Sequence, residues 1–366
     1  MIHDTIFSPS FGNRPSYLVG RETAIQNLMA GLQSRPGSKG RATVLLGQRG
    51  SGKTVLLWEL ADRAAKEGFV VATPTVVSEG MLERVVEKIQ DAGERHVNRP
   101  VRVSGGSIGA FGFSAGLEFT QAVQEYKSFE YKLLQLARKL SSEGKGVLIL
   151  IDELQANSSE VKQLVIAYQE LVGEGLDVAL VMAGLPGAVS ATLNDKVLTF
   201  LNRAQKIELE PLSTLDVDAY YQHAFAELGL HVCAENRLTA ATATCGSPYL
   251  LQLIGHAIVM RATDDGSLSE DNLRRAISDS EAEFKNDVCE TTLAALSDRD
   301  AAFLRAMASD KGPSKVSAVA ERMSVTVDYA QKYRRRLIDA GVIEAPARGV
   351  VAFCVPYLAE HLRARE

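Results

Sequence analysis

The sequence has few of the residues from which disulfide frameworks and metal sites are built. Four cysteines occur among 366 residues without any C-x-x-C spacing, and the six histidines are equally scattered. This usage favours a reduced, cytoplasmic compartment. No metal site can be assembled from these residues by their spacing alone. The four cysteines are Cys233, Cys245, Cys289 and Cys354.

Long hydrophobic runs are also missing. A membrane span needs about 20 consecutive apolar residues, and the longest run here, Val178 to Val189, is interrupted by Gly-Leu-Pro-Gly at 184–187. The first seven residues, Met1 to Phe7, lack the basic and apolar regions of a signal peptide. We therefore expect a cytoplasmic protein that has no membrane partner.

Composition otherwise describes an ordinary globular protein. Hydrophobic residues make up 46% and charged residues 23% of the chain, and the length allows two or three domains with their own cores. The net charge of −5 is uneven, because the part from Thr291 onward carries about +3 and the remainder about −8. A basic C-terminal part is a weak indication of a polyanionic partner.

One motif carries specific chemistry. Residues 47–54 match the phosphate-binding pattern G-x-x-x-x-G-K-[ST], in which glycines let backbone N–H groups surround a polyphosphate. Lys53 then supplies a charge to the β- and γ-phosphates, and the hydroxyl of Thr54 completes the shell of a Mg²⁺ ion. The expected contacts are Gly47, Gln48, Arg49, Gly50, Ser51, Gly52, Lys53 and Thr54.

The flanks of this motif fit the same interpretation. Ala42–Leu46 is a short run of strand-forming residues, and the residues from Thr54 onward have helical apolar spacing. A strand, a glycine loop and a helix N-terminus together form an anion site. The alternative is a glycine turn with an incidental lysine. We expect the protein to bind ATP or ADP.

A second motif follows the apolar run Gly146–Ile151, which is typical of a central strand buried on both faces. Asp152 and Glu153 come at the carboxyl end of this strand, where α/β sheets bind ligands. Asp152 is predicted to hold Mg²⁺, and Glu153 to polarise the attacking water as general base. The alternative is a pair of acidic residues that ends a strand and caps the next helix.

Strands and helices alternate through the first two hundred residues, which predicts a P-loop α/β fold with a parallel sheet sandwiched by helices. The glycine-rich segment 101–117 interrupts this alternation. It is predicted to be a β-hairpin or a mobile flap, and the alternative is a flexible linker. Arg203 precedes the last predicted strand. It is a candidate for contacting a γ-phosphate, its own or a neighbour's, or else a surface arginine paired with a carboxylate.

The remaining sequence predicts two smaller parts. Short helical segments at 214–228, 235–244, 248–262 and 269–284 predict an all-α lid. The C-terminal sequence predicts three helices, of which one ends near Ala308 and the others lie at 316–323 and 326–340. Two predicted strands follow between 342 and 355. This order is a winged helix-turn-helix pattern.

The helix predicted at 326–340 has a basic face. Its cations are opposed locally only by Asp328 and Asp339, so the face suits the phosphates and base edges of double-stranded DNA. A solvated helix face or a protein-docking module would show the same pattern. The candidate DNA contacts are Gln331, Lys332, Arg334, Arg335 and Arg336.

The order and spacing of these motifs resemble AAA+ ATPases, close to the origin-recognition-complex-like and STAND branch. Tyr17–Glu22 is similar to the family's adenine-side motif, which implies nucleotide contacts at Val19, Gly20 and Arg21. The stretch Gly246-Ser247-Pro248 resembles the lid turn of that branch, and implies a contact from Pro248. Arg203 falls where the family's arginine finger lies. No lid arginine stands at 246–248, which favours the STAND-like variant.

These observations predict an ATPase core at 1–211, a lid at 212–290 and a winged helix at 291–366. The leading hypothesis is an ATP-binding, slowly hydrolysing switch that engages DNA through the winged helix. Its rival is a signalling or assembly switch whose winged helix packs on its own core or on a protein partner, with no DNA bound. The partner in that case is a homo-oligomer or another protein. A metabolic kinase is disfavoured, since no small-substrate domain is evident.

Overall fold

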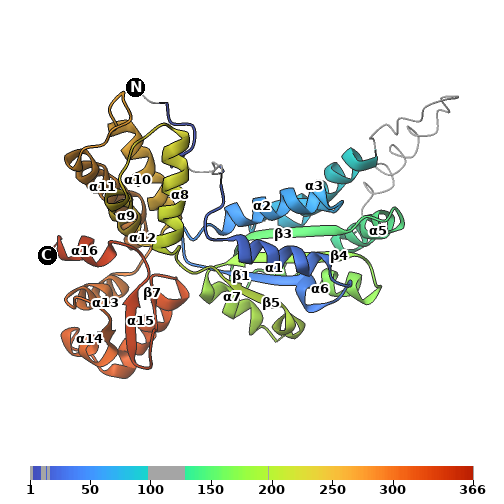
Figure 1. Ribbon diagram of the computed structural model, residues 1–366. Coiled ribbons are helices and arrows are strands. Elements are labelled where there is room, and N and C mark those ends of the chain that lie inside the picture. Colours follow the sequence, from blue (N-terminus) through green and yellow to red (C-terminus); the bar gives the residue numbers. More distant parts are fainter. Residues whose placement is uncertain (1–2, 10–13, 15–16, 98–127, 197, 366) are drawn as a thin grey trace.

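The computed structural model describes residues 3–9, 14, 17–97, 128–196 and 198–365, and it places the ATPase core beside two smaller parts (Figure 1). The glycine-rich segment 101–117 lies outside the described residues, so the three alternatives for it, a hairpin, a flap or a linker, are not tested.

The core is built on one parallel sheet with the strand order β2-β3-β4-β1-β5. Every neighbouring pair in this sheet is parallel, as the alternation of strands and helices predicted. All carboxyl ends therefore meet at one edge. The strands are β1 (Ala42–Leu46), β2 (Val70–Val76), β3 (Val147–Leu154), β4 (Val178–Gly184) and β5 (Gln205–Glu208).

Helices cover both faces of this sheet. Leu45, Leu148 and Val181 pack against α1 and α2 on one face, while Val44 and Ile149 pack on the opposite face against α3, α5 and α6. The apolar run at 146–151 is thus buried on both sides, as predicted. The helices of the core are α1 (Glu22–Gln33), η1 (Lys39–Arg41), α2 (Lys53–Lys66), α3 (Met81–Val97), α5 (Phe129–Ser142), α6 (Ser159–Gly173), α7 (Pro186–Leu193) and η2 (Thr199–Arg203).

Four helices form the part that the sequence indicated as a lid. They share a core that also takes in Ile6 and Phe7 from the N-terminal segment. Gly255 makes room for this segment, since a Cβ there would lie 2.7 Å from Cζ of Phe7. Asp4 accepts hydrogen bonds from the backbone N–H groups of Ile6 and Phe7 and contacts Nδ1 of His256. The helices are α8 (Thr214–Glu227), α9 (Ala234–Ala243), α10 (Pro248–Arg261) and α11 (Glu270–Phe284).

The C-terminal part contains the expected helices and two strands, with additions that the sequence pattern did not reveal. Strand β6 pairs antiparallel with β8, which makes a three-stranded sheet in the order β6-β8-β7. A π-helical turn follows α11 directly, and a last helix follows β8. The elements are η3 (Lys285–Glu290), α12 (Thr291–Ala294), α13 (Asp298–Ala308), β6 (Ser314–Lys315), α14 (Val316–Arg322), α15 (Val327–Asp339), β7 (Ile343–Glu344), β8 (Val350–Phe353) and α16 (Leu358–Arg363).

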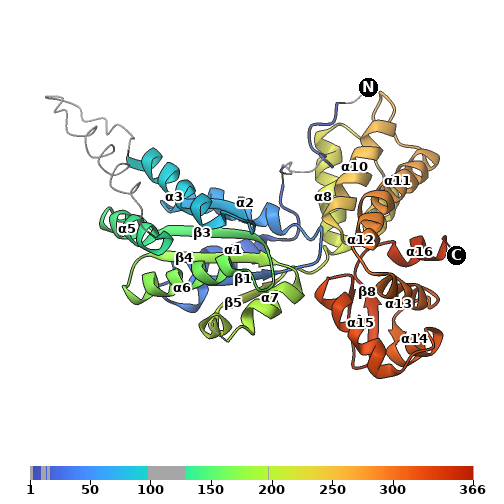
Figure 2. The ribbon, with the colours of Figure 1, turned by 180° about the vertical axis from the view of Figure 1, so that it is seen from behind.

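Both ribbon views place this C-terminal part against the core, with α15 beside α7 (Figures 1 and 2). The helical region of α8–α11 lies above it and continues into it through η3. None of the helices in the described ranges is long and apolar enough to cross a membrane.

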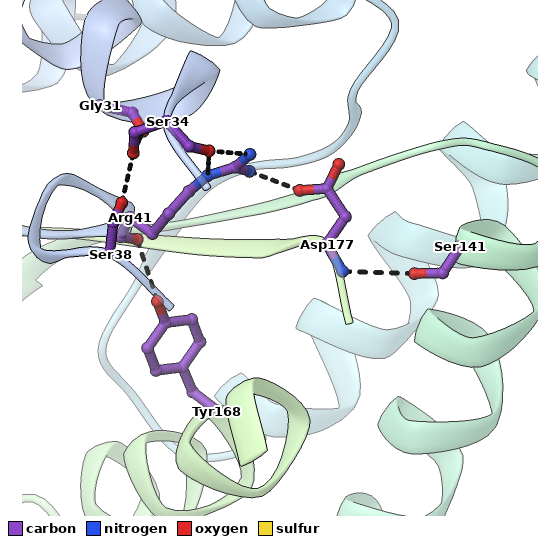
Figure 3. Close-up of polar contacts among 7 residues, drawn as sticks. All are labelled: Gly31, Ser34, Ser38, Arg41, Ser141, Tyr168 and Asp177. Carbon is purple, nitrogen blue, oxygen red and sulfur yellow. Dashed lines mark hydrogen bonds and ion pairs between the residues drawn. The ribbon is translucent and has the colours of Figure 1, made fainter. Parts of the chain in front are cut away.

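A buried arginine joins the strands at the amino edge of the sheet (Figure 3). Arg41 is only 4% exposed; its guanidinium donates to the backbone oxygen of Ser34 and pairs with Asp177 at 2.5 Å. Its own backbone oxygen accepts a hydrogen bond from the hydroxyl of Tyr168. The guanidinium also lies 5.4 Å from the centre of the Phe69 ring. This arrangement ties α1, β1, β4 and α6 together on the side opposite the phosphate loop.

Removing the countercharge of this arginine should destabilise the core. Asp177→Asn leaves the buried guanidinium without a carboxylate, and we expect a loss of about 2–3 kcal/mol in the free energy of unfolding. The expected value is below the full cost of a broken buried pair, because the Asp177 side chain is 39% exposed and partly screened. Urea unfolding followed by the fluorescence of Trp58, the single tryptophan and a half-buried residue of α2, measures this loss.

Glu174→Gln is the matched control. It makes the same carboxylate-to-amide change in an exposed pair with Arg138, whose side chain is 48% exposed, and should cost below about 1 kcal/mol. Equal losses in the two variants would contradict a structural role for the Arg41 network.

Candidate functional site

The phosphate loop connects the carboxyl end of β1 to the first residue of α2, as the sequence predicted. Gly50 and Gly52 have φ values of +73° and +87°, in the left-handed region that glycine adopts without strain. A Cβ at Gly50 would meet no described atom, whereas one at Gly47 would overlap the hydroxyl of Ser51. The Oγ of Ser51 is buried and has no hydrogen-bond partner among the described residues. The loop is therefore an open turn of backbone that fits an anion at the positive end of α2.

Lys53 lies across this loop. Its ammonium group donates to the backbone oxygens of Gly47, at 2.8 Å, and Gln48, at 2.7 Å. Burial lowers the pKa of Lys53 to about 8, although the nearby carboxylates of Asp152 and Glu153 oppose this shift. An ammonium has three donors, so two hold the loop and one remains for a phosphate oxygen.

Thr54 and Asp152 meet next to Lys53. The Thr54 hydroxyl donates to one oxygen of the Asp152 carboxylate at 2.6 Å, and the other oxygen accepts the backbone N–H of Glu153 at 2.9 Å. Asp152 is 3% exposed and Thr54 is exposed, so the pair lies at the border between the sheet and the crevice. A hydroxyl and a carboxylate are hard oxygen ligands of the kind Mg²⁺ prefers. The donor set fits the predicted metal.

Glu153 has an unusual backbone conformation. Its φ is +53°, and the pairing of β3 with β4 shifts register between Ile151 and Leu154. A non-glycine residue in this region costs about 1 kcal/mol or more, and such strain tends to occur at functional sites. At this irregular point of β3 the Glu153 side chain is exposed, whereas all the other residues of the strand are buried. Glu153 thereby faces the crevice, with Lys53 close enough to be affected by its charge.

The predicted adenine-side residues connect the loop to the helical region. Arg21 is 8% exposed and donates to the backbone oxygen of Ser51 at 3.1 Å. Burial lowers the pKa of Arg21, while Asp216 on α8 opposes the shift. Gly20 has a φ of +60°, and a Cβ there would lie 3.2 Å from the Asp216 carboxylate. Val19 packs against the core of α8–α11.

The turn at 246–248 also reaches the phosphate loop. A Cβ on Gly52 would lie 3.8 Å from Cγ of Pro248, the first residue of α10. Gly246 has a φ of +72°, and a Cβ there would come within 2.7 Å of the backbone oxygen of Leu212. Its own backbone oxygen accepts the N–H of Leu212. Val19, Gly20, Arg21 and Pro248 are thus gathered beside the loop.

Arg203 lies apart from this cluster. It ends η2, two residues before β5, whose first residue Gln205 pairs with Thr43 while its last residue Glu208 pairs with Leu46. Since β5 has 4 residues, about 13 Å of strand separates Arg203 from the phosphate loop. The option of a contact with its own γ-phosphate is therefore removed. A contact with a neighbour's site stays a prediction.

The basic face of α15 is smaller than the sequence suggested. Arg336 pairs with Asp300 of α13 at 2.7 Å, so a carboxylate from another helix opposes these cations in addition to Asp328 and Asp339. Arg334 is half-buried and donates to Gln331 at 3.4 Å. Lys332 and Arg335 are exposed, and the Lys332 ammonium lies 5.6 Å from the centre of the Tyr329 ring. Sequence spacing could not reveal Asp300, which comes from another helix.

One contact of the phosphate loop was missed altogether. Nε2 of Gln48 donates to Sγ of Cys354 at 3.5 Å, across 306 positions of sequence. Oε1 of Gln48 is buried and has no hydrogen-bond partner in the described part of the chain. Nothing in the sequence signals this contact, because Gln48 stands at a position that the phosphate-loop pattern leaves unspecified.

A parallel sheet with a glycine loop, a buried lysine and a threonine–aspartate pair at its carboxyl edge defines the class of P-loop nucleotide-binding proteins. Comparison with family models agrees: residues 17–181 match the AAA ATPase domain. Residues 286–362 match a domain of unknown function. No curated protein sequence matches the chain significantly.

Solved structures show the same overall fold. A Walker-type ATPase of Pyrococcus abyssi matches with a TM-score of 0.70 and 17% identity, over 99% of this chain and 100% of that one. The ORC2 protein of Aeropyrum pernix, solved in ADPNP–ADP complexes, matches with a TM-score of 0.65 and 18% identity, over 97% and 94%. The Cdc6p protein of Pyrobaculum aerophilum gives 0.52 and 17%, over 97% and 95%.

Residues 17–181 therefore match the AAA ATPase domain, and the chain as a whole is similar in fold to archaeal Walker-type and ORC-type ATPases. Both comparisons agree with the resemblance to AAA+ ATPases that the motifs indicated, at the level of the domain and the fold.

The pKa of Lys53 makes nucleotide affinity depend on pH. A bound polyphosphate favours the protonated ammonium, so above pH 8 the loop must take up a proton as it binds. We expect ATP affinity to fall about tenfold between pH 7 and pH 9. Calorimetry in two buffers of different ionisation enthalpy measures both the affinity and the proton uptake at pH 9.

Lys53→Ala is the control. It should lower ATP affinity at least tenfold at pH 7, because a charge-assisted hydrogen bond is lost, and it should leave no proton uptake at pH 9. A wild-type affinity that stays flat from pH 7 to pH 9 would contradict the role of the ammonium.

Proposed function

We propose that the protein is an ATP-binding, slowly hydrolysing AAA+ switch with Mg²⁺ as cofactor, and that it engages double-stranded DNA through a C-terminal winged helix. The observation that carries the nucleotide part is the cluster at the carboxyl edge of the sheet. There Lys53, Thr54, Asp152 and Glu153 come together from two neighbouring elements.

Each residue of this cluster has a distinct role in the proposal. Backbone N–H groups of the loop and the ammonium of Lys53 bind the phosphates, and Thr54 with Asp152 holds the metal, which offsets the charge of the phosphates. Glu153 accepts a proton from the attacking water as general base. Its exposed position after the twist of β3 supports this role, because a base must reach the crevice.

Hydrolysis should depend on Glu153 while binding should not. Glu153→Gln keeps the size of the side chain and leaves Asp152 in place, but it removes the proton acceptor. We expect ATP affinity within about threefold of wild type and a hydrolysis rate reduced about 10²-fold or more. Single-turnover hydrolysis and calorimetry measure the two quantities. Glu174→Gln, the same change away from the crevice, should leave both unaltered; wild-type hydrolysis in Glu153→Gln would reduce that residue to a structural role.

The proposed switch has three parts, divided near residues 211 and 290. Pro248, in the proposed lid, lies so near the phosphate loop that a Cβ on Gly52 would be 3.8 Å from its Cγ. This proximity supports the proposal that a nucleotide which alters the loop would also alter the lid. The ADPNP–ADP complexes of the Aeropyrum pernix relative support a nucleotide in this position.

The proposed winged helix is supported by three helices, α13 to α15, and a small antiparallel sheet, in which the β7–β8 connection would be the wing. Helix α15 would be the recognition helix, with Gln331, Lys332 and Arg335 as the contacts to DNA. Arg336 is assigned instead to its pair with Asp300, and Arg334 to a half-buried position.

The rival function is a switch whose winged helix docks on protein. Two exposed apolar side chains on the first turn of α15, Val327 at 45% and Tyr329 at 39%, favour it. DNA binding and protein docking differ in their dependence on salt, because phosphate contacts release condensed counterions.

The double variant Lys332→Ala/Arg335→Ala tests the DNA interface. If both side chains contact phosphates, affinity for duplex DNA should fall and the slope of log affinity against log salt should decrease by about two. Fluorescence anisotropy over a salt series measures the slope.

Arg305→Ala/Lys311→Ala is the matched control, because it removes two exposed cations from the same part of the chain outside α15. Its slope should equal that of wild type. An absence of duplex binding by wild type at low salt, with and without ATP, would decide for the protein-docking function.

A further inference from the structure

The C-terminal part touches the ATPase core at a point where only glycine fits. Gly187, near the start of α7, lies so close to the end of α15 that a Cβ would come within 2.5 Å of both Cβ and the backbone oxygen of Asp339. Gly187 has no positive φ, so its backbone accepts any residue. The requirement for glycine here comes from the close approach of the two helices alone.

A second contact lies next to the first and involves the phosphate loop. The side chain of Gln48 fills the space beside Gly341, where a Cβ would overlap Oε1 of Gln48, and its Nε2 donates to Cys354. Leu185, which joins β4 to α7, lies 3.3 Å from the same Cβ position. The end of α15 thus contacts two loops at the carboxyl edge of the sheet, one of which binds phosphate.

The geometry points to a direct latch: Gln48 and Gly187 hold the C-terminal part against the core, and a nucleotide bound in the phosphate loop weakens this contact. We define the latch as Gln48, Leu185 and Gly187 on the core with Asp339, Gly341 and Cys354 on the C-terminal part. The inference rests on the proposed nucleotide switch, but its route is new, since it passes from the loop to α15 without the lid.

The direction of the coupling follows from the hydrogen bonds of Gln48. Its backbone oxygen is held by the ammonium of Lys53, the same group whose third donor is left for an incoming phosphate. Its Oε1 is buried without a partner in the described structure, which costs free energy as long as the latch is closed. A loop that rearranges around phosphate moves the Gln48 peptide and its side chain together, and releases the unpaired oxygen to solvent.

Such coupling is reciprocal. If the nucleotide weakens the latch by some factor, opening the latch strengthens nucleotide binding by the same factor, which for coupled sites is typically about 5- to 150-fold. The two effects can be measured independently on one variant.

Gly187→Ala opens the latch by a single methyl group. The alanine side chain would overlap the backbone of Asp339, while in α7 itself alanine is the better helix former. Gly173→Ala is the matched control: it is also a helical glycine without a positive φ, and a Cβ there would meet no described atom within 4 Å.

The thiol of Cys354 reports the state of the latch. Burial raises its pKa to about 12, and Gln48 covers part of it. Iodoacetamide labelling, read by peptide mass spectrometry, should be about tenfold faster at Cys354 in Gly187→Ala than in wild type. Gly173→Ala should match wild type, and exposed Cys233 should react equally in all three proteins. Unchanged labelling of Cys354 in Gly187→Ala would overturn the latch.

The coupling is tested by adding ATP analogue and Mg²⁺. Saturating, non-hydrolysed analogue should speed Cys354 labelling in wild type about tenfold, and calorimetry should show Gly187→Ala binding it about tenfold more tightly than Gly173→Ala. If wild type binds the analogue but its labelling rate does not change, the latch is not coupled and this inference is wrong. If wild type binds no nucleotide, the proposed function fails, and the labelling of Gly187→Ala still decides whether the latch exists.

Discussion

The structure depends on one electrostatic constraint: the ammonium of Lys53 is buried at the carboxyl edge of a parallel sheet, against backbone oxygens. Burial lowers its pKa, and the carboxylates of Asp152 and Glu153 act against that shift. The glycines of the loop, the buried Asp152 and the twist at Glu153 are arranged around this charge. A polyanion placed there meets a cation, a helix N-terminus and a set of backbone donors that are already in position.

Local sequence patterns predicted the strands and the phosphate loop of the core, because each of these features is formed by contiguous residues. The loop at 47–54 and the run ending in Asp152 each specify a strand end and a ligand contact, and the sheet joins them through strand order. Arg203 shows the limit of that reasoning. Its position before β5 was predicted correctly, but only the pairing of β5 with β1 reveals that it stands at the opposite edge from the loop.

Contacts between distant segments could not be predicted. Arg336 meets Asp300, Gln48 meets Cys354, and Gly187 meets Asp339, each across a distance in sequence that no periodicity links. Glycines illustrate the reason. Gly50 and Gly52 are required by their own backbone conformation, which a turn motif encodes, whereas Gly187 is required by a neighbour that arrives some 150 positions later. A sequence pattern records the first kind of requirement and not the second.

The packing of the N-terminal segment into the helices of α8–α11 bears on how the chain is made. The Phe7 ring packs edge-on or tilted against Tyr220, Tyr221 and Phe225, so the ATPase core lies in sequence between two halves of one hydrophobic cluster. During synthesis Phe7 is made more than two hundred residues before the aromatic side chains that it contacts. Closing so long a loop is entropically costly unless the intervening part has already become compact. A core that has already folded shortens the effective loop, and this favours the docking of Phe7 onto the helical region after the core is formed.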